Sequence, residues 1–153
     1  MGAAREFYNK SCQLFEKLGS KFELSDYYFN LGEVCVFEKQ YQKALDCYMR
    51  GLKIDKVHGN IPSIASDYNM IGELYEEMDN FTEAERFFNE AIEICQNIEA
   101  PMELASAYYN LGLLYKKKGK INRAREYLRQ AQEIYSRIDT PDYSKVKEEL
   151  LSL

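Results

Sequence analysis

The chain has 153 residues, of which 46% are hydrophobic and 29% charged, and its formal net charge is −5. This length and composition predict one globular domain, and the negative balance disfavours a protein built mainly to bind nucleic acid. No apolar run approaches the roughly 18 residues of a membrane span, and no signal-peptide pattern opens the chain. We therefore expect a cytoplasmic protein without a membrane partner.

Cysteine and histidine do not indicate a metal site or a catalytic site. The cysteines form no C-x-x-C pair, so we expect free thiols in a reducing compartment. The only histidine, His58, has no nearby cluster of cysteines or carboxylates that could complete a zinc site. Because a Ser/His/Asp set and a glycine-rich phosphate loop are also missing from the sequence, we expect no enzyme, no metal and no cofactor.

In chain order, the first complete helical pattern lies within residues 25–64. Apolar residues at steps of three and four predict a helix through Tyr28, Leu31 and Cys35 that stops near residues 39–40. A second helix is predicted to follow, through Ala44 and Tyr48. The same two patterns recur later in the chain, with first helices that stop near residues 79–80 and 119–120.

Capping residues indicate where the predicted helices start. Thr82 can cap a second helix, with Glu85 reaching back to form a capping box, and Asn122 can cap the next one alone. Three prolines suit the first turn of a following helix, where the missing N–H group is harmless. These prolines are Pro62, Pro101 and Pro141.

The pattern repeats every forty residues without gaps. Three glycines share one repeat position: Gly32, Gly72 and Gly112. Three alanines share another: Ala44, Ala84 and Ala124. We therefore divide a single domain, residues 1–153, into a half repeat 1–24, repeats 25–64, 65–104 and 105–144, and a terminal helix 141–153.

The repeated glycines predict close contacts between helices. A glycine in the middle of a helix costs about 1 kcal/mol relative to alanine, so three at one position imply a compensating gain. We expect the backbones of paired helices to approach closely at these glycines, with the repeated alanines opposite them. Three large aromatic residues are expected to fill the space between helix pairs: Tyr75, Phe88 and Tyr115.

These motifs resemble the tetratricopeptide repeat, whose pattern is W-x2-L-G-x2-Y followed by A-x3-F. Here residues 68–75 read YNMIGELY and residues 84–88 read AERFF. The resemblance covers essentially the whole chain and implies an all-α fold: a right-handed α-solenoid of antiparallel helix pairs, with three full repeats flanked by two half repeats. It specifies the fold rather than the function, because this fold serves many different partners.

The second helices depart from the family pattern in one informative way. Lys56, Gln96 and Ser136 stand where the family has its closing proline, so these helices can run on and give forty residues instead of about 34. Such long repeats are similar to those of the Pins/LGN scaffolds, kinesin light chains and bacterial peptide-sensing regulators, which bind peptides or protein segments in a concave groove. The resemblance therefore implies a protein–protein interaction module, a scaffold or adaptor, that holds a peptide or helix of a partner protein in its groove.

By the same resemblance, the first helix of each pair lines the groove. The matching positions lie three before, one after, four after and five after the motif glycine. They give Phe29, Glu33, Val36 and Phe37 in the first repeat, Asn69, Glu73, Glu76 and Glu77 in the second, and Tyr109, Leu113, Lys116 and Lys117 in the third.

Charge is divided unevenly between the repeats. Residues 66–105 hold eleven acidic residues and one basic residue, whereas residues 106–145 hold nine basic and four acidic residues. Two interpretations stay open. The groove acids attract a basic or amphipathic peptide or helix, or Glu76–Lys116 and Glu77–Lys117 form ion pairs between stacked repeats on a solvated face, each worth only about 0–1 kcal/mol.

Self-assembly is the main alternative to peptide binding. By this register the chain begins with a second helix and ends with a first helix, so each end exposes a face that would normally stack on a neighbour. The ends could pair with another copy in a homo-oligomer or continue into a larger TPR array. Nucleic-acid binding is disfavoured, because the basic cluster of the third repeat lies beside the strongly acidic second repeat.

Overall fold

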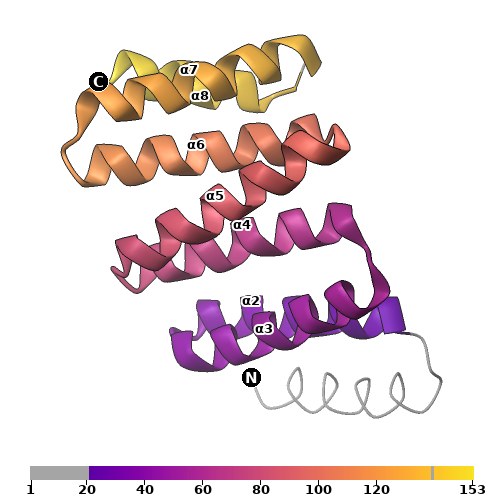
Figure 1. The fold of residues 1–153 in the computed structure, drawn as a ribbon. Helices are drawn as coiled ribbons and strands as arrows, with labels where there is room; N and C mark the ends of the chain where they lie inside the picture. Colours follow the sequence, from indigo (N-terminus) through magenta and orange to yellow (C-terminus); the bar gives the residue numbers. More distant parts are fainter. Residues whose placement is uncertain (1–20, 139) are drawn as a thin grey trace. The chain divides into compact units, whose positions relative to one another are not determined.

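The structure is a computed structural model that describes residues 21–138 and 140–153, and every regular element in these ranges is an α-helix (Figure 1). The helices are α2 (Lys21–Phe37), α3 (Tyr41–His58), α4 (Ile61–Glu77), α5 (Phe81–Ile98), α6 (Pro101–Lys117), α7 (Ile121–Ile138) and α8 (Asp142–Leu151). The half repeat predicted for residues 1–24 lies, apart from the start of α2, outside the described residues. None of the helices described here is both long and apolar enough to cross a membrane.

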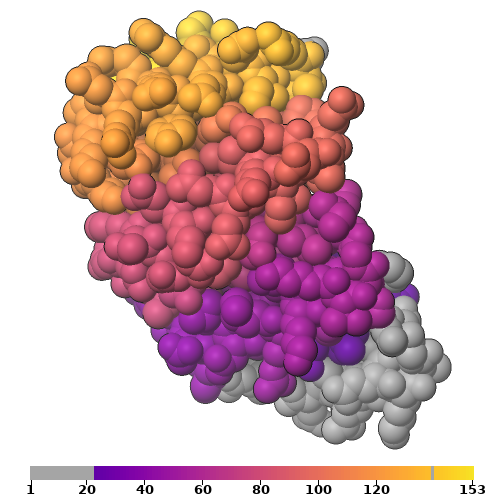
Figure 2. All heavy atoms as spheres, in the orientation of Figure 1, coloured from indigo at the N-terminus to yellow at the C-terminus, as the bar shows by residue number. Residues whose placement is uncertain are grey.

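The chain divides into two compact units, Met1–Asp67 and Tyr68–Leu153. In the first unit, α2 packs along α3. In the second unit, α5 packs against α6, α6 against α7, and α7 against α8. Side chains fill the spaces that the ribbon drawing leaves between α5, α6 and α7 (Figure 2). The all-helical fold class expected from the repeat pattern is confirmed in these residues.

The first helix of each pair ends in the same backbone turn. Lys39, Asp79 and Gly119 have left-handed φ angles of 58°, 57° and 69°. At the middle turn the Asp79 N–H donates to the Glu76 carbonyl at 3.0 Å, and the Asn80 N–H donates to the Tyr75 carbonyl at 2.9 Å. This pair of bonds is the Schellman arrangement, which satisfies carbonyls that the end of a helix would leave open. The first helices therefore stop where the sequence predicts.

The start of α5 differs from the expected capping. Helix α5 begins at Phe81, and the side chain of Asn80 accepts a hydrogen bond from the Glu83 N–H at 3.4 Å. Thr82 therefore lies inside the first turn, where it cannot be the N-cap. Asn122 is likewise inside α7, which begins at Ile121. The turn places the helix start two residues earlier than the capping-box pattern indicated, because Asn80 already follows the left-handed residue that ends α4.

The repeated glycines are buried, as expected, but their contacts differ from the prediction. A Cβ atom added at Gly72 would lie 2.5 Å from Cε1 of Phe88, and one added at Gly112 would lie 2.6 Å from Cγ of Leu128. Gly32 meets the ring of Tyr48 in the same way. The glycines therefore face the large residue of the A-x3-F motif rather than its alanine.

The repeated alanines have a separate place in the core. All three are fully buried, and Ala84 and Ala124 belong to a cluster with Phe88, Leu111 and Tyr115. Phe88 thus contacts Gly72 on one side and the residues of α6 on the other, which agrees with its expected place between helix pairs. Tyr75 is partly buried against the same cluster, and it also stacks on Phe87 of its own pair, with ring centroids 5.4 Å apart.

Candidate functional site

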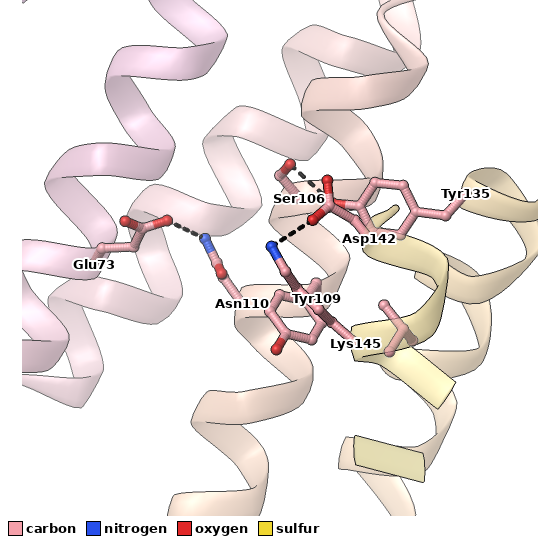
Figure 3. A pocket seen from close by; sticks show the side chains of 8 residues that line it. Glu73, Ser106, Tyr109, Asn110, Tyr135, Asp142 and Lys145 are labelled. Atoms are coloured by element: carbon pink, nitrogen blue, oxygen red, sulfur yellow. Dashed lines mark hydrogen bonds and ion pairs between the residues drawn. The ribbon is translucent and has the colours of Figure 1, made fainter. Parts of the chain in front are cut away.

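A pocket of about 210 Å³ opens in the second unit where α4, α6, α7 and α8 meet (Figure 3). Figure 3 shows Glu73 on one side of this pocket and Asp142 and Lys145 on the other. Its lining is mostly polar, with one buried aliphatic residue. The lining residues are Glu73, Ser106, Tyr109, Asn110, Tyr135, Asp142, Lys145 and Val146.

Helical spacing brings the α6 residues of the pocket to one face. Ser106, Tyr109 and Asn110 follow one another at steps of three and one, so their side chains lie on neighbouring parts of the same helix surface. Glu73 comes from α4, directly after Gly72. The close packing at Gly72 fixes α4 against its partner α5, which also fixes the position from which Glu73 extends.

Glu73 and Asn110 join α4 to α6. The Asn110 Nδ2 donates a hydrogen bond of 2.7 Å to the Glu73 Oε1. Asn110 is only 8% exposed, so its amide is held in place by packing as well as by this bond. A buried amide with a charged acceptor makes a stronger hydrogen bond than a neutral pair does. The Glu73 carboxylate is therefore oriented by its own protein.

The surroundings of Glu73 do not favour its negative charge. Desolvation raises the pKa of Glu73, the hydrogen bond from Asn110 lowers it, and the charge of Glu76 raises it again, with a net shift upward. The residue as a whole still has access to solvent. The carboxylate is consequently a partly desolvated acceptor whose charge is incompletely stabilised, on a residue that solvent still reaches.

The opposite wall contains two polar pairs. The Ser106 Oγ and the Tyr135 hydroxyl lie 3.0 Å apart in a hydrogen bond. The Lys145 Nζ donates to the Asp142 Oδ1 at 2.7 Å. Burial raises the pKa of Tyr135, while its bond to Ser106 acts in the opposite direction. These hydroxyl and carboxylate groups leave the wall rich in hydrogen-bond acceptors.

Some residues expected in the groove lie together in the second unit. Glu73 and Tyr109 both line the pocket. Glu76 forms an ion pair with Lys117, in which the Lys117 Nζ lies 2.6 Å from the Glu76 Oε1. Glu77 is exposed, and Leu113 is partly buried.

The ion pairs differ from those expected on the solvated face. Glu76 pairs with Lys117 rather than with Lys116. Lys116 instead donates to Glu149 at 2.8 Å and to Ser152 at 2.7 Å. Lys116 has this different partner because α8 places the Glu149 carboxylate within its reach. The predicted pairs came from comparing α4 with α6 alone, which does not include α8.

Other expected groove residues are occupied in packing or lie elsewhere. Asn69 is 6% exposed, and its Nδ2 donates to the Glu103 carbonyl at 3.1 Å. In the first unit, the Phe29 ring lies where a Gly51 side chain would be, and it stacks on Tyr48 at 5.3 Å. Glu33 is exposed, Val36 is partly buried, and Phe37 is 81% exposed.

Sequence reasoning missed most of the pocket's polar lining. The sequence contained one signal for Asn110: an asparagine, Asn30, stands at the same position of the first repeat, two residues before the motif glycine. Tyr135 comes from α7, and Asp142 and Lys145 come from α8. The residues forty positions earlier do not predict such polar groups; they are Cys95, Met102 and Ala105. Within the described residues, no group of three or more His, Cys, Asp or Glu side chains is arranged to hold a metal ion.

Comparison with known proteins identifies the family. Two family models, both described as tetratricopeptide repeat, match residues 63–137 and residues 25–58, which together make up more than two thirds of the chain. The chain is a tetratricopeptide-repeat protein. A search among curated proteins finds no match to this tetratricopeptide-repeat chain.

Solved structures with the same fold come from varied proteins. The apo form of RapI matches with a TM-score of 0.86 at 18% identity, over 96% of this chain and 54% of RapI. A signal transduction ATPase with numerous domains from Pyrococcus horikoshii, which has a tetratricopeptide repeat sensor, matches with a TM-score of 0.84 at 18% identity, over 95% of this chain and 22% of that one. BtubC (BKLC) from P. vanneervenii matches with a TM-score of 0.73 at 22% identity, over 97% of this chain and 71% of that one. These likenesses show an α-solenoid fold of the tetratricopeptide-repeat type.

Proposed function

We propose that this tetratricopeptide-repeat chain binds a peptide or helix of another protein along the face that α4 and α6 share. The observation that carries the proposal is the polar pocket on that face, between Glu73 on one side and Tyr109 on the other. Family membership supports a protein-interaction module, since tetratricopeptide repeats are generally non-catalytic. The pocket adds a place where one side chain of the partner can be held.

The pocket has the features of an anchor site for a bound segment. Peptide-binding surfaces concentrate affinity in a few side chains that enter pockets, while the surrounding contacts mainly exclude water. Tyr109 is partly buried and offers a rigid aromatic wall, and the oriented Glu73 carboxylate offers a directed acceptor. A partner segment lying over α6 would reach both from one side.

The similar structures extend this proposal only to a binding role. In the Pyrococcus horikoshii protein the repeats are described as a sensor, which suits a domain that recognises another molecule. This chain spans 54% of RapI and 22% of that ATPase, so the activities of those whole proteins are not assigned to it. The proposed role is therefore recognition of a protein segment by the repeat domain itself.

Selection from a displayed library of random 12-residue peptides tests the proposal. Peptides selected on the wild-type chain should bind Tyr109→Ala at least about tenfold more weakly, because an aromatic anchor contact is lost. Tyr143→Ala is the matched control, since Tyr143 is also a partly buried tyrosine packed on the same apolar cluster but does not line the pocket. Circular dichroism establishes that both variants stay helical. If no peptide is selected, or if both variants bind the selected peptides equally well, the proposal is wrong.

A further inference from the structure

We infer that the pocket between α4, α6 and α8 takes a basic side chain, an arginine or a lysine of the bound segment, with Glu73 as its counter-ion. This inference rests on the proposed function, because it assigns the chemistry of the side chain that the segment places in the pocket. Four features of the pocket lead to it: its charge balance, the state of Glu73, the surrounding field and the shape of the lining.

The lining has one more negative charge than positive charge. Its carboxylates belong to Glu73 and Asp142, and its only ammonium group belongs to Lys145. Lys145 already donates to Asp142 at 2.7 Å, so this pair largely neutralises itself. Glu73 is thus the charged group of the lining that has no cationic partner there, and a ligand in the pocket would meet it in that state.

Glu73 is ready to accept a cation. Its hydrogen-bond donor in the pocket is the neutral amide of Asn110, which orients the carboxylate without balancing its charge. Desolvation and the charge of Glu76 both work against the ionised form. A cation placed beside Glu73 would relieve exactly that cost, and charge-assisted hydrogen bonds are among the strongest that proteins make.

The acidic side chains next to the pocket disfavour an acidic ligand. Glu76 and Glu77 follow Glu73 on α4, one turn further along the helix. Lys117, the nearby basic residue of α6, is already paired with Glu76 at 2.6 Å. A carboxylate or phosphate entering here would face unfavourable like charges, whereas an ammonium or guanidinium group would not.

The lining also suits the long stem of a basic residue better than an apolar side chain. Tyr109 supplies an aromatic wall along which such a stem can lie, with its charge near the ring. The hydroxyls of Ser106 and Tyr135 can accept hydrogen bonds from the N–H groups of the ligand. Val146 is the only aliphatic residue of the lining, and every other lining residue has a polar group, so a leucine or phenylalanine anchor would remove polar groups from water without bonding to them.

The inference has a direct consequence for the pH dependence of binding. A bound cation stabilises ionised Glu73, so the complex holds fewer protons than the free protein as Glu73 titrates. Affinity should therefore rise with pH through the acidic range and level off above the pKa of free Glu73. Asp142 and Lys145 line the same pocket, and the charge of Glu76 acts on Glu73 from outside the lining. The pKa values of Tyr109 and Tyr135 are raised by burial, so these two residues titrate only at alkaline pH.

The test uses the peptides selected on the wild-type chain. In each peptide the arginine is replaced by citrulline, which keeps the shape and removes the charge, or the lysine by acetyl-lysine, which removes the charge and adds a small acetyl group. Binding is measured to the wild type, to Glu73→Gln and to the matched control Glu148→Gln, which removes one negative charge from the exposed surface of α8 outside the pocket lining. Glu73→Gln keeps an oxygen that can accept from Asn110.

We expect the selected peptides to share a basic residue whose neutralisation weakens binding to the wild type and to Glu148→Gln by about tenfold or more. Glu73→Gln should bind charged and neutral peptides equally and lose the acidic pH dependence. Selected peptides without a common basic residue would overturn the inference while leaving the proposed function intact. A neutralised peptide that binds the wild type as tightly as the charged peptide would also overturn it. So would a Glu73→Gln variant whose affinities for the charged and the neutral peptide both fall by the same factor relative to the wild type. Failure to select any peptide would overturn both.

Discussion

Gly72 lies against the ring of Phe88, so that a side chain at position 72 would place its Cβ atom 2.5 Å from the ring carbon Cε1. The phenylalanine ring is fully buried and continues into the cluster that α5 and α6 share. The contact therefore joins the inside of one helix pair to the next helix in the same unit. A close-packed contact of this kind leaves no room for even one added methyl group.

Replacing Gly72 by alanine should destabilise the fold. Alanine favours a helix over glycine by about 1 kcal/mol, but overpacking at a buried contact costs about 1–3 kcal/mol. We expect the second effect to prevail, because the Phe88 ring is enclosed and cannot move away. Thermal unfolding followed by circular dichroism would show a lower Tm for Gly72→Ala. In a Phe88→Leu background, Gly72→Ala should lower the Tm less than it does in the wild type, because the smaller side chain leaves room for the added methyl group. An unchanged Tm in the single variant would contradict this account.

A buried cluster in the first unit predicts how stability depends on pH. Ser25, Asp55 and Asp67 are each at most 4% exposed, and the Ser25 hydroxyl donates a hydrogen bond to Asp55. Burial raises the pKa of Asp67 to about 8, and the charges of Asp55 and Asp26 add to the shift. One oxygen of Asp67 also lacks a hydrogen-bond partner in the structure.

The folded protein therefore holds a proton on Asp67 that the unfolded chain releases near pH 4. This stability is fully present below about pH 4 and is lost progressively as the pH rises to about 8, above which the loss is constant. Asp67→Asn should remove this dependence and be more stable than the wild type at pH 8 by a few kcal/mol, at about 1.4 kcal/mol per pKa unit. The control is Asp46→Asn, an exposed change on α3. Urea unfolding at pH 5 and pH 8 measures the effect, and parallel pH profiles for the wild type and Asp67→Asn would refute it.

The left-handed turn residues make an internal comparison possible. Asp79 and Gly119 occupy equivalent turns with φ angles of 57° and 69°, yet only glycine adopts this conformation without a steric cost. Asp79→Gly should raise the free energy of unfolding by about 0.5–1 kcal/mol, and Gly119→Ala should lower it by about 1–2 kcal/mol. Both positions are exposed, so packing should not obscure the result. Chemical unfolding of the two variants decides the matter, and changes of the same sign would count against the turn geometry.

The Tyr115 hydroxyl connects three helices of the second unit. It donates to Glu85 of α5 at 2.5 Å and accepts from Arg123 of α7 at 3.1 Å. Tyr115→Phe keeps the buried ring, which is 2% exposed, but leaves the Glu85 oxygen without this donor. We expect a loss of about 1–2 kcal/mol in the free energy of unfolding. Tyr127→Phe is a suitable control, because its ring stacks on Tyr115 at 5.4 Å. A loss of equal size in both variants would indicate that the hydroxyl network of Tyr115 has no special role.

Repeat spacing predicted the elements of this fold better than their contacts. The three glycines, the helix ends near residues 40, 80 and 120, and the helical class all follow from apolar steps and turn residues along the chain. The partner of each glycine did not follow. Ala84 and Phe88 lie one turn apart on the same face of α5, so the pattern places both inside without saying which of them meets Gly72.

The candidate site was harder to predict for a related reason. Glu73 and Tyr109 occupy positions that the family pattern marks as variable, and the structure places both beside one pocket. Asp142 and Lys145 close that pocket from α8, and the residues forty positions earlier, Met102 and Ala105, carry no charge that would have predicted them. Lys117 pairs with Glu76, and Lys116 pairs with Glu149. A lysine side chain is long enough to pair with carboxylates on more than one neighbouring helix, so an alignment of repeats residue by residue does not predict its partner.

Asn110 holds the Glu73 carboxylate in position before any ligand arrives. A ligand of the pocket thus meets a carboxylate that is already oriented, so that binding costs little further conformational entropy of the Glu73 side chain. Loosening this amide should leave the choice of ligand unchanged. It should appear instead as a shorter residence time, since the dissociation rate is where most differences between related complexes arise.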